Sequence, residues 1–263
     1  MGASEREKII RYYRASGDAE LAAKLLDAAE AALRYRKYKI TDFLDPFGFT
    51  VAETIAAHYP RLRLDASGGY AAAERVRAVF SDEDFAGEAD YGIAALRIEF
   101  DPRYYQLTHR DVLGALTGLG LKREVIGDII MLPDGCQVII DAAMAAFALQ
   151  QLSKIGTAPA KSELLPLEQL AAKEERQKEI RTTVASLRLD VVAAAGFGVS
   201  RSKMAGDIAL DKLKVNWQDA KSSSQTLKPG DIISMRGRGR VEISDIIGQT
   251  KKGRISIVLK RFL

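Results

Sequence analysis

The segment 188–259 changes its hydrophobic period once, from that of a helix to that of a strand, and this change limits the folds open to it. Leu189, Val192 and Ala193 are spaced as one face of a helix, which a pair of glycines then ends. Beyond Leu213, apolar and polar residues alternate as they do in a strand. The segment is therefore expected to pack short helices against a small antiparallel sheet.

A second helix is predicted to begin after Ser200, a residue type that caps helix N-termini, and to run to about Leu210. Met204 and Ile208 are expected on its buried side, which leaves three charged residues outside: Arg201, Lys203 and Asp207. Because backbone N–H groups and the positive end of the helix dipole meet there, this helix start suits a phosphate oxygen.

Strands are predicted near 213–218 and 232–236, and a hairpin is predicted to join 241–247 to 254–259. The stretch 236–240 alternates arginine with glycine, and the hairpin loop contains two adjacent lysines. Glycines let a backbone approach a partner closely, and guanidinium groups suit phosphates and stacked bases.

Charge is distributed unevenly along the chain. Residues 181–263 contain 16 Lys and Arg against 7 Asp and Glu, whereas the remainder contains 23 against 28, so the net charge of +4 conceals a basic module beside a mildly acidic body. A basic module attracts polyphosphate, and nucleic acid is the first partner to expect. The predicted RNA-binding residues are Arg188, Ser200, Arg201, Ser202, Lys203, Lys212, Lys214, Arg236, Arg238, Arg240, Lys251, Lys252 and Arg254.

Residues 186–240 resemble an S4-type RNA-binding domain, a helix-helix-strand module of ribosome-associated proteins. Three stretches are similar to the variant of this domain in the YlmH family: Asn216-Trp217, 234–240 and 250–254. The sequence departs from the S4 pattern at Asp211, where many S4 domains have glycine.

Motifs in the rest of the chain resemble the same family in the same order: 43–48, 68–75 and 108–129. The resemblance implies work on the large ribosomal subunit, including subunits obstructed by peptidyl-tRNA during ribosome-associated quality control, and a link to cell division. It also implies an RRM-like middle domain, although the aromatic stacking motifs of RRM domains are not evident.

The fold class expected is α+β, in four parts. They are a helical N-terminal region (1–60), an RRM-like α+β domain (61–165), a helical linker (166–182) and an S4 domain (183–263). The middle sheet is expected to contain strands at 75–80 and 97–100, a hairpin about Pro133-Asp134-Gly135, and covering helices at 108–119 and 141–152. The stretch 156–166 is expected to be a connection.

Two smaller features allow alternatives. Gly114, Gly118 and Gly120 weaken a helix, and either close packing or the close approach of a partner explains them, with packing the expected cause. A basic and aromatic cluster at 34–39 either contacts RNA or is a helix end whose long side chains reach solvent.

Several classes of protein are excluded or disfavoured. One cysteine rules out an intramolecular disulfide framework, and with only two histidines beside Cys136 we expect no metal site and no cofactor. The charged N-terminus lacks a signal peptide, and no apolar run is long enough to cross a bilayer, so a cytoplasmic monomer is expected.

The chain is expected not to be an enzyme. Arg188-Leu189-Asp190 resembles a catalytic motif of pseudouridine synthases, but here it falls inside the S4-like segment, where Asp190 is expected to pair with a cation or favour its helix start. The prediction is a non-enzymatic protein that docks on structured ribosomal or transfer RNA of the large subunit. The alternatives are an RNA-modifying enzyme of pseudouridine-synthase type and a structural adaptor in cell division or photosystem assembly.

Overall fold

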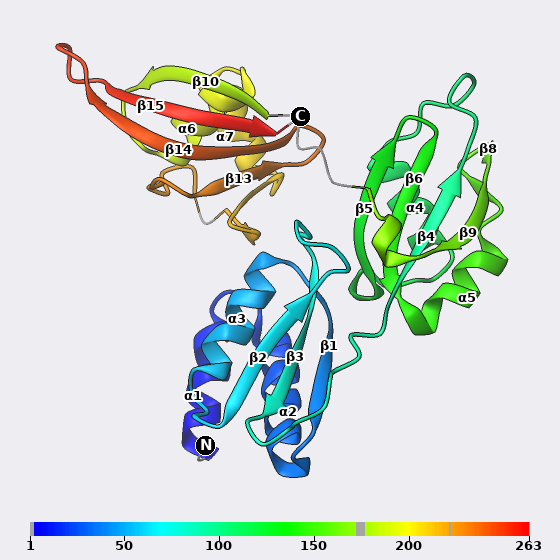
Figure 1. Cartoon of the computed structure of the whole chain (residues 1–263). Helices are drawn as coiled ribbons and strands as arrows, with labels where there is room; N and C mark the ends of the chain where they lie inside the picture. Colours follow the sequence, from blue (N-terminus) through cyan, green and yellow to red (C-terminus); the bar gives the residue numbers. More distant parts are fainter. Residues whose placement is uncertain (1–2, 172–176, 221, 263) are drawn as a thin grey trace. The chain divides into compact units, whose positions relative to one another are not determined.

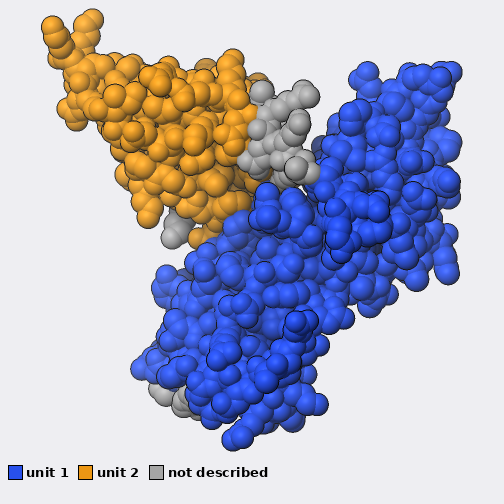
Figure 2. All heavy atoms as spheres, viewed as in Figure 1, with its two compact units in different colours: residues 1–173 blue, residues 174–263 orange. Residues whose placement is uncertain are grey.

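The computed structural model describes residues 3–171, 177–220 and 222–262, and the chain divides into two compact units, residues 1–173 and 174–263 (Figure 2). Each unit combines helices with antiparallel sheets, which confirms the predicted α+β class.

The first unit begins with three helices packed on a three-stranded sheet (Figure 1). The helices are α1 (Ala3–Arg14), α2 (Ala19–Tyr35) and α3 (Pro46–Ala56). The antiparallel strands follow the order β1 (Tyr38–Leu44), β3 (Val76–Asp82), β2 (Leu62–Ser67). Their core includes Leu26, Ile55 and Phe80, all fully buried.

This sheet corrects two expectations. The region before residue 60 contains β1 as well as helices, and the strand predicted at 75–80 pairs with β1 and β2 instead of joining the middle sheet. The alternating pattern of a strand shows which side chains face inward but not which strand is its neighbour.

A second sheet of the first unit has the antiparallel order β5 (Ile126–Leu132), β6 (Gly135–Asp141), β4 (Ile93–Glu99), β9 (Lys161–Leu165). The predicted hairpin is confirmed by β5 and β6. The expected connection at 156–166 is wrong, because it contains the short β8 (Ala158–Pro159), which pairs with β7 (Lys154–Ile155), and then β9.

Helices α4 (His109–Gly118) and α5 (Ala142–Gln151) cover one face of this second sheet, as predicted. Asp111 accepts a hydrogen bond from the Thr108 N–H at 2.8 Å at the start of α4. The expectation that Gly114, Gly118 and Gly120 pack closely is wrong, because a Cβ at any of the three would meet nothing within 4 Å. Gly120 instead takes a φ of +92°, which glycine adopts at little cost.

Hydrogen bonds fasten the two sheets of the first unit to each other. The carboxylate of Asp128 on β5 accepts from the Tyr70 hydroxyl at 2.7 Å and from the N–H groups of Glu74 and Arg75 at 2.8 and 3.1 Å. The Arg75 guanidinium donates to the carbonyl oxygens of Phe43 and Ile126 at 2.7 and 3.0 Å. The N-terminal and middle sheets are thereby parts of one unit.

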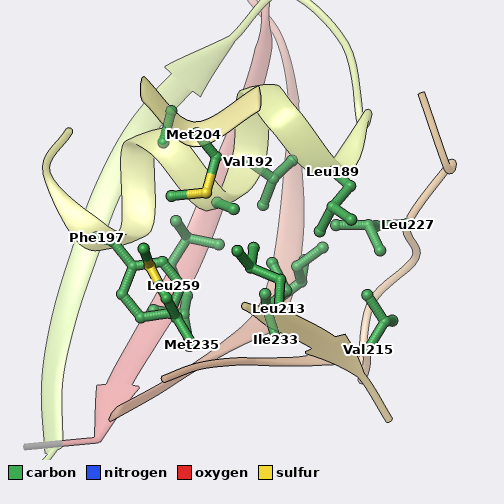
Figure 3. Close-up of a cluster of buried hydrophobic side chains, with 14 of the residues drawn as sticks. Leu189, Val192, Phe197, Met204, Leu213, Val215, Leu227, Ile233, Met235 and Leu259 are labelled. Carbon is green, nitrogen blue, oxygen red and sulfur yellow. The ribbon is translucent and has the colours of Figure 1, made fainter. Parts of the chain in front are cut away.

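The second unit packs α6 (Leu189–Phe197) and α7 (Arg201–Ala209) against one sheet of six strands. The strand order is β10 (Gln177–Val184), β15 (Ile255–Phe262), β14 (Gly239–Gln249), β13 (Ile232–Met235), β11 (Leu213–Val215), β12 (Gln218–Asp219). Figure 3 shows Leu189, Val192, Phe197 and Met204 of the helices pointing toward Leu213, Ile233, Met235 and Leu259 of the strands.

The expected helical linker at 166–182 is wrong in its described part. Leu167–Gln169 is a single 3₁₀ turn, residues 172–176 lie outside the described residues, and β10 begins at Gln177. Charged residues suggested a solvated helix, but β10 pairs with β15 along its whole length. Pairing with a strand that is distant in the sequence here outweighs the weak local preference for a helix.

Candidate nucleic-acid interface

Helix α7 begins as predicted, with Ser200 as its cap. The Ser200 hydroxyl accepts a hydrogen bond from the Lys203 N–H at 3.3 Å, and Gly198 before it has a φ of +67° that ends α6. Arg201, Ser202 and Lys203 occupy the first turn, and all three are exposed. This turn therefore presents two cations and backbone N–H groups to solvent.

A buried carboxylate positions two of the predicted RNA-binding arginines. Asp190 lies in the first turn of α6 with its side chain 5% exposed. It accepts from Arg188 at 3.1 and 3.2 Å and from Arg201 Nε at 2.9 Å. Burial favours the protonated acid, but the two guanidinium groups outweigh it and hold the pKa of Asp190 below its usual value. Asp190 thus pairs with cations as expected, and it orients Arg188 and Arg201 while both remain partly exposed.

A second carboxylate acts in the same way on the other side of α7. Asp207 was expected to face solvent, but it is buried, and its Oδ1 accepts from Lys212 Nζ at 2.8 Å. The hydrogen bond from Lys212 lowers the pKa of Asp207, and the charges of Lys203 and Arg238 lower it further. Lys212 therefore pairs directly with this carboxylate, and the charges of Lys203 and Arg238 act on it as well. The expectation that Asp207 lies on the solvent side of the helix is wrong.

The glycine-arginine stretch forms the turn between β13 and β14. Gly237 and Gly239 take φ values of +76° and +83°, and the Arg238 N–H bonds to the Met235 carbonyl at 3.0 Å. The Arg236 N–H bonds to the Lys212 carbonyl at 3.0 Å, so this turn lies against the strand that follows α7. The glycines are explained by the turn itself.

Seven predicted residues thus belong to one connected surface, which we call the α7 basic surface: Arg188, Arg201, Ser202, Lys203, Lys212, Arg236 and Arg238. Ser200 contributes to it as the cap of α7.

Lys214 and Arg240 lie on a different face. They flank Ser234 across the register of β11, β13 and β14, whereas the alternate residues of these strands point into the core. Directly paired residues share a face, so both side chains lie on the side of the sheet away from the helices. There the Arg240 guanidinium stacks over the Phe262 ring at 5.3 Å.

The hairpin loop is also apart from the α7 basic surface. Lys251 and Lys252 are exposed at the far end of β14, ten residue steps or roughly 30 Å from the β13–β14 turn. Arg254 donates to the Thr183 hydroxyl at 3.1 Å and to its carbonyl at 2.6 Å, which fastens β15 to β10. The predicted set of residues is therefore spread over three places in the second unit.

The middle sheet does not present the face that RRM domains use to stack bases. Opposite its helices, Ile130 and Ile139 are buried against Phe43. On the same face, the Gln137 side chain binds the backbone of Gln169 and Ala171 at 3.3 and 2.7 Å. The chain itself occupies this face.

The sequence offered one other reactive group, the single cysteine. Cys136 is fully buried in β6, and burial raises the pKa of its thiol to about 12.

Among the described residues, no group of three or more acidic, histidine or cysteine side chains is placed to hold a metal ion. No helix in the described ranges has the length and apolarity needed to cross a membrane.

Comparison with known proteins finds similarity along most of the chain. Residues 17–85 match the family model "YlmH, N-terminal", residues 87–169 match "Putative RNA-binding domain in YlmH", and residues 187–233 match "S4 domain". The boundary between the first two matches falls between β3 and β4, where the chain passes from the first sheet to the second.

Two relatives agree with these matches. "Ribosome-associated protein quality control protein P2" of Bacillus subtilis (strain 168) is 34% identical over 226 residues, which cover 86% of this chain and 88% of that protein. A solved structure titled "Cell division protein ylmH from Streptococcus pneumoniae" has a TM-score of 0.51 and 25% identity, covering 59% of this chain and 95% of that chain.

Proposed function

Because the chain belongs to the YlmH family, we propose that it is a ribosome-associated RNA-binding protein that docks through the α7 basic surface on structured RNA of the large ribosomal subunit. The observation that carries this proposal is the pair of buried carboxylates, Asp190 and Asp207, which orient partly exposed cations at the start of α7 and just beyond its end. Ribosomal and transfer RNA are the partners that this charge arrangement suits.

The contact to RNA is electrostatic and shape-selective. Arg201 and Lys203 bind phosphate oxygens beside the N–H groups of α7, and Arg238 binds a neighbouring phosphate from the β13–β14 turn. Asp190 holds Arg201 in one place, so less side-chain freedom is lost when RNA binds. Phosphate contacts of this kind fix position and orientation without reading a sequence.

The proposed process is ribosome-associated quality control, in which the protein acts on large subunits obstructed by peptidyl-tRNA. The name of the Bacillus subtilis relative supports this process. The same process supports a cytoplasmic location. The apolar clusters of each unit are buried within a single chain, which supports action as a monomer.

The proposal includes a non-catalytic role. Asp190, the acid in the motif that resembles pseudouridine synthases, is already engaged by two arginines. Its side chain is only 5% exposed, whereas a catalytic acid or base must come within hydrogen-bond reach of its substrate. The engaged carboxylate favours RNA docking over base modification.

Sedimentation of lysate from cells producing tagged protein tests the proposal. We expect enrichment with free large subunits, transfer RNA in the same fractions, and loss from those fractions in Arg201→Gln/Lys203→Gln. Absence of the unmodified protein from every ribosomal fraction at low salt would contradict it.

A further inference from the structure

A second basic surface lies in the first unit, where α2 ends and β1 begins. It consists of Arg34, Tyr35, Arg36, Lys37 and Lys39, and we call it the α2–β1 surface; all five residues are exposed. Tyr35 is 61% exposed, and Lys39 Nζ lies 6.0 Å from the centroid of its ring. An aromatic ring is thus left open to solvent among four cations.

The charges of the α2–β1 surface are not neutralised by the acids beside it. Within the described residues, none of its four cations forms an ion pair within 4 Å. The acidic run 82–84 lies close, since the Asp82 N–H bonds to the Lys37 carbonyl at 3.3 Å, but its three carboxylates all bind Arg61 at 2.7 to 3.1 Å. The cations are therefore available to a partner.

The helix dipole explains only part of this surface. A cation in the last turn of a helix is favourable, and Arg34 occupies that position. Arg36 follows the helix with a φ of +48°, a conformation in which glycine is less strained. Lys37 and Lys39 lie beyond the helix end, so capping of the dipole does not account for them.

We propose that the α2–β1 surface binds unpaired RNA, with one base stacked on Tyr35 and the adjoining phosphates on Arg36 and Lys37. An open ring beside guanidinium and ammonium groups is the combination that single-stranded nucleic acid uses, because every base has a stacking face and every linkage a charge. An acidic peptide would use the cations but leave the ring without a role. This site goes beyond the docking function, since it lies in the other unit and does not depend on the α7 basic surface.

The test uses the full chain and a fluorescent ~12-nucleotide oligouridine, in an Arg201→Gln/Lys203→Gln background that weakens the second unit's contribution. Tyr35→Ala is expected to weaken binding at least about fivefold, because stacking on an aromatic side chain contributes roughly that much or more. Tyr35→Phe keeps the ring and is expected to bind as the parent does. Arg36→Gln/Lys37→Gln is expected to lower the slope of log affinity against log salt by about 1.4, for two phosphate contacts to a single strand.

The matched control is Arg14→Gln/Arg63→Gln, which removes two exposed arginines of the same unit from α1 and β2. Equal losses in the control and in Arg36→Gln/Lys37→Gln would show diffuse attraction and overturn the site. Binding unchanged by Tyr35→Ala would also overturn it. Displacement of oligouridine by polyglutamate at equal charge would identify an acidic protein as the partner instead.

Discussion

Replacing Asp190 by alanine tests the view that this buried carboxylate organises the α7 basic surface. The change removes three hydrogen bonds of 2.9 to 3.2 Å to two guanidinium groups. Charge-assisted bonds contribute up to about 3 kcal/mol each, but Arg188 and Arg201 are partly exposed and regain water, so we expect a loss of about 2 kcal/mol in the free energy of unfolding. For a unit of this size, that corresponds to a fall of roughly 10 °C in Tm.

Fluorescence of Trp217, the single tryptophan, monitors the second unit during thermal unfolding. Asp219→Ala is the control. Asp219 is 74% exposed, and its ion pair with Lys214 Nζ is a long one at 3.6 Å, so its loss is expected to change Tm little. Equal effects of the two substitutions would refute the reasoning.

Lowering the pH further tests the contribution of Asp190 to stability. Its pKa is lower in the folded protein than in the unfolded chain, so its contribution to stability is present above about pH 4 and is lost as the pH falls through the folded pKa. The difference in Tm between the unmodified chain and Asp190→Ala should therefore shrink in that range. A difference that persists after Asp190 is protonated would indicate a packing effect.

Three other positions carry predictions. Gly196→Ala should lower the stability of the second unit by about 1–3 kcal/mol, because the new Cβ would lie 2.7 Å from Val241 Cγ1, and an unchanged Trp217 melt would contradict this. Asp211→Gly should raise its Tm by a few degrees, because residue 211 has a φ of +51°; a lower Tm would show that the Asp211 side chain contributes more than the backbone costs. Cys136 should not react with a thiol reagent at pH 8 until the chain unfolds, because its thiol is buried with a pKa of about 12; rapid labelling of folded protein would contradict the burial.

Local signals in the sequence predicted the two helices and the hairpin of the second unit. The cap at Ser200, the buried positions of α7 and the β14–β15 hairpin depend on residues close together in the chain. Asp211 is informative in the same way, because its left-handed backbone occupies the place where related domains have glycine.

Features that depend on distant residues were not predictable from local pattern. The pairing of β3 with β1 and the strand β10 both rest on partners far away in the sequence. Asp207 occupies a position that polarity assigns to solvent, but it is buried where Lys212, beyond the end of α7, binds its carboxylate and the charge of Arg238, in the β13–β14 turn, acts on it. The length of β14 separates the hairpin loop from the α7 basic surface, and the register of β11, β13 and β14 places Lys214 and Arg240 on the face away from the helices.

Binding of purified large ribosomal subunits across a salt series tests the central claim most directly. If about four phosphates are neutralised at the α7 basic surface, affinity should fall on the order of 100-fold between roughly 50 and 200 mM salt. This magnitude uses the salt dependence per phosphate that holds for duplex DNA. Arg201→Gln/Lys203→Gln should reduce the slope of log affinity against log salt by about 1.8. Thermal unfolding followed by Trp217 fluorescence should show that the second unit of this variant is still folded. An unchanged slope in this variant would show that the RNA is bound elsewhere on the chain.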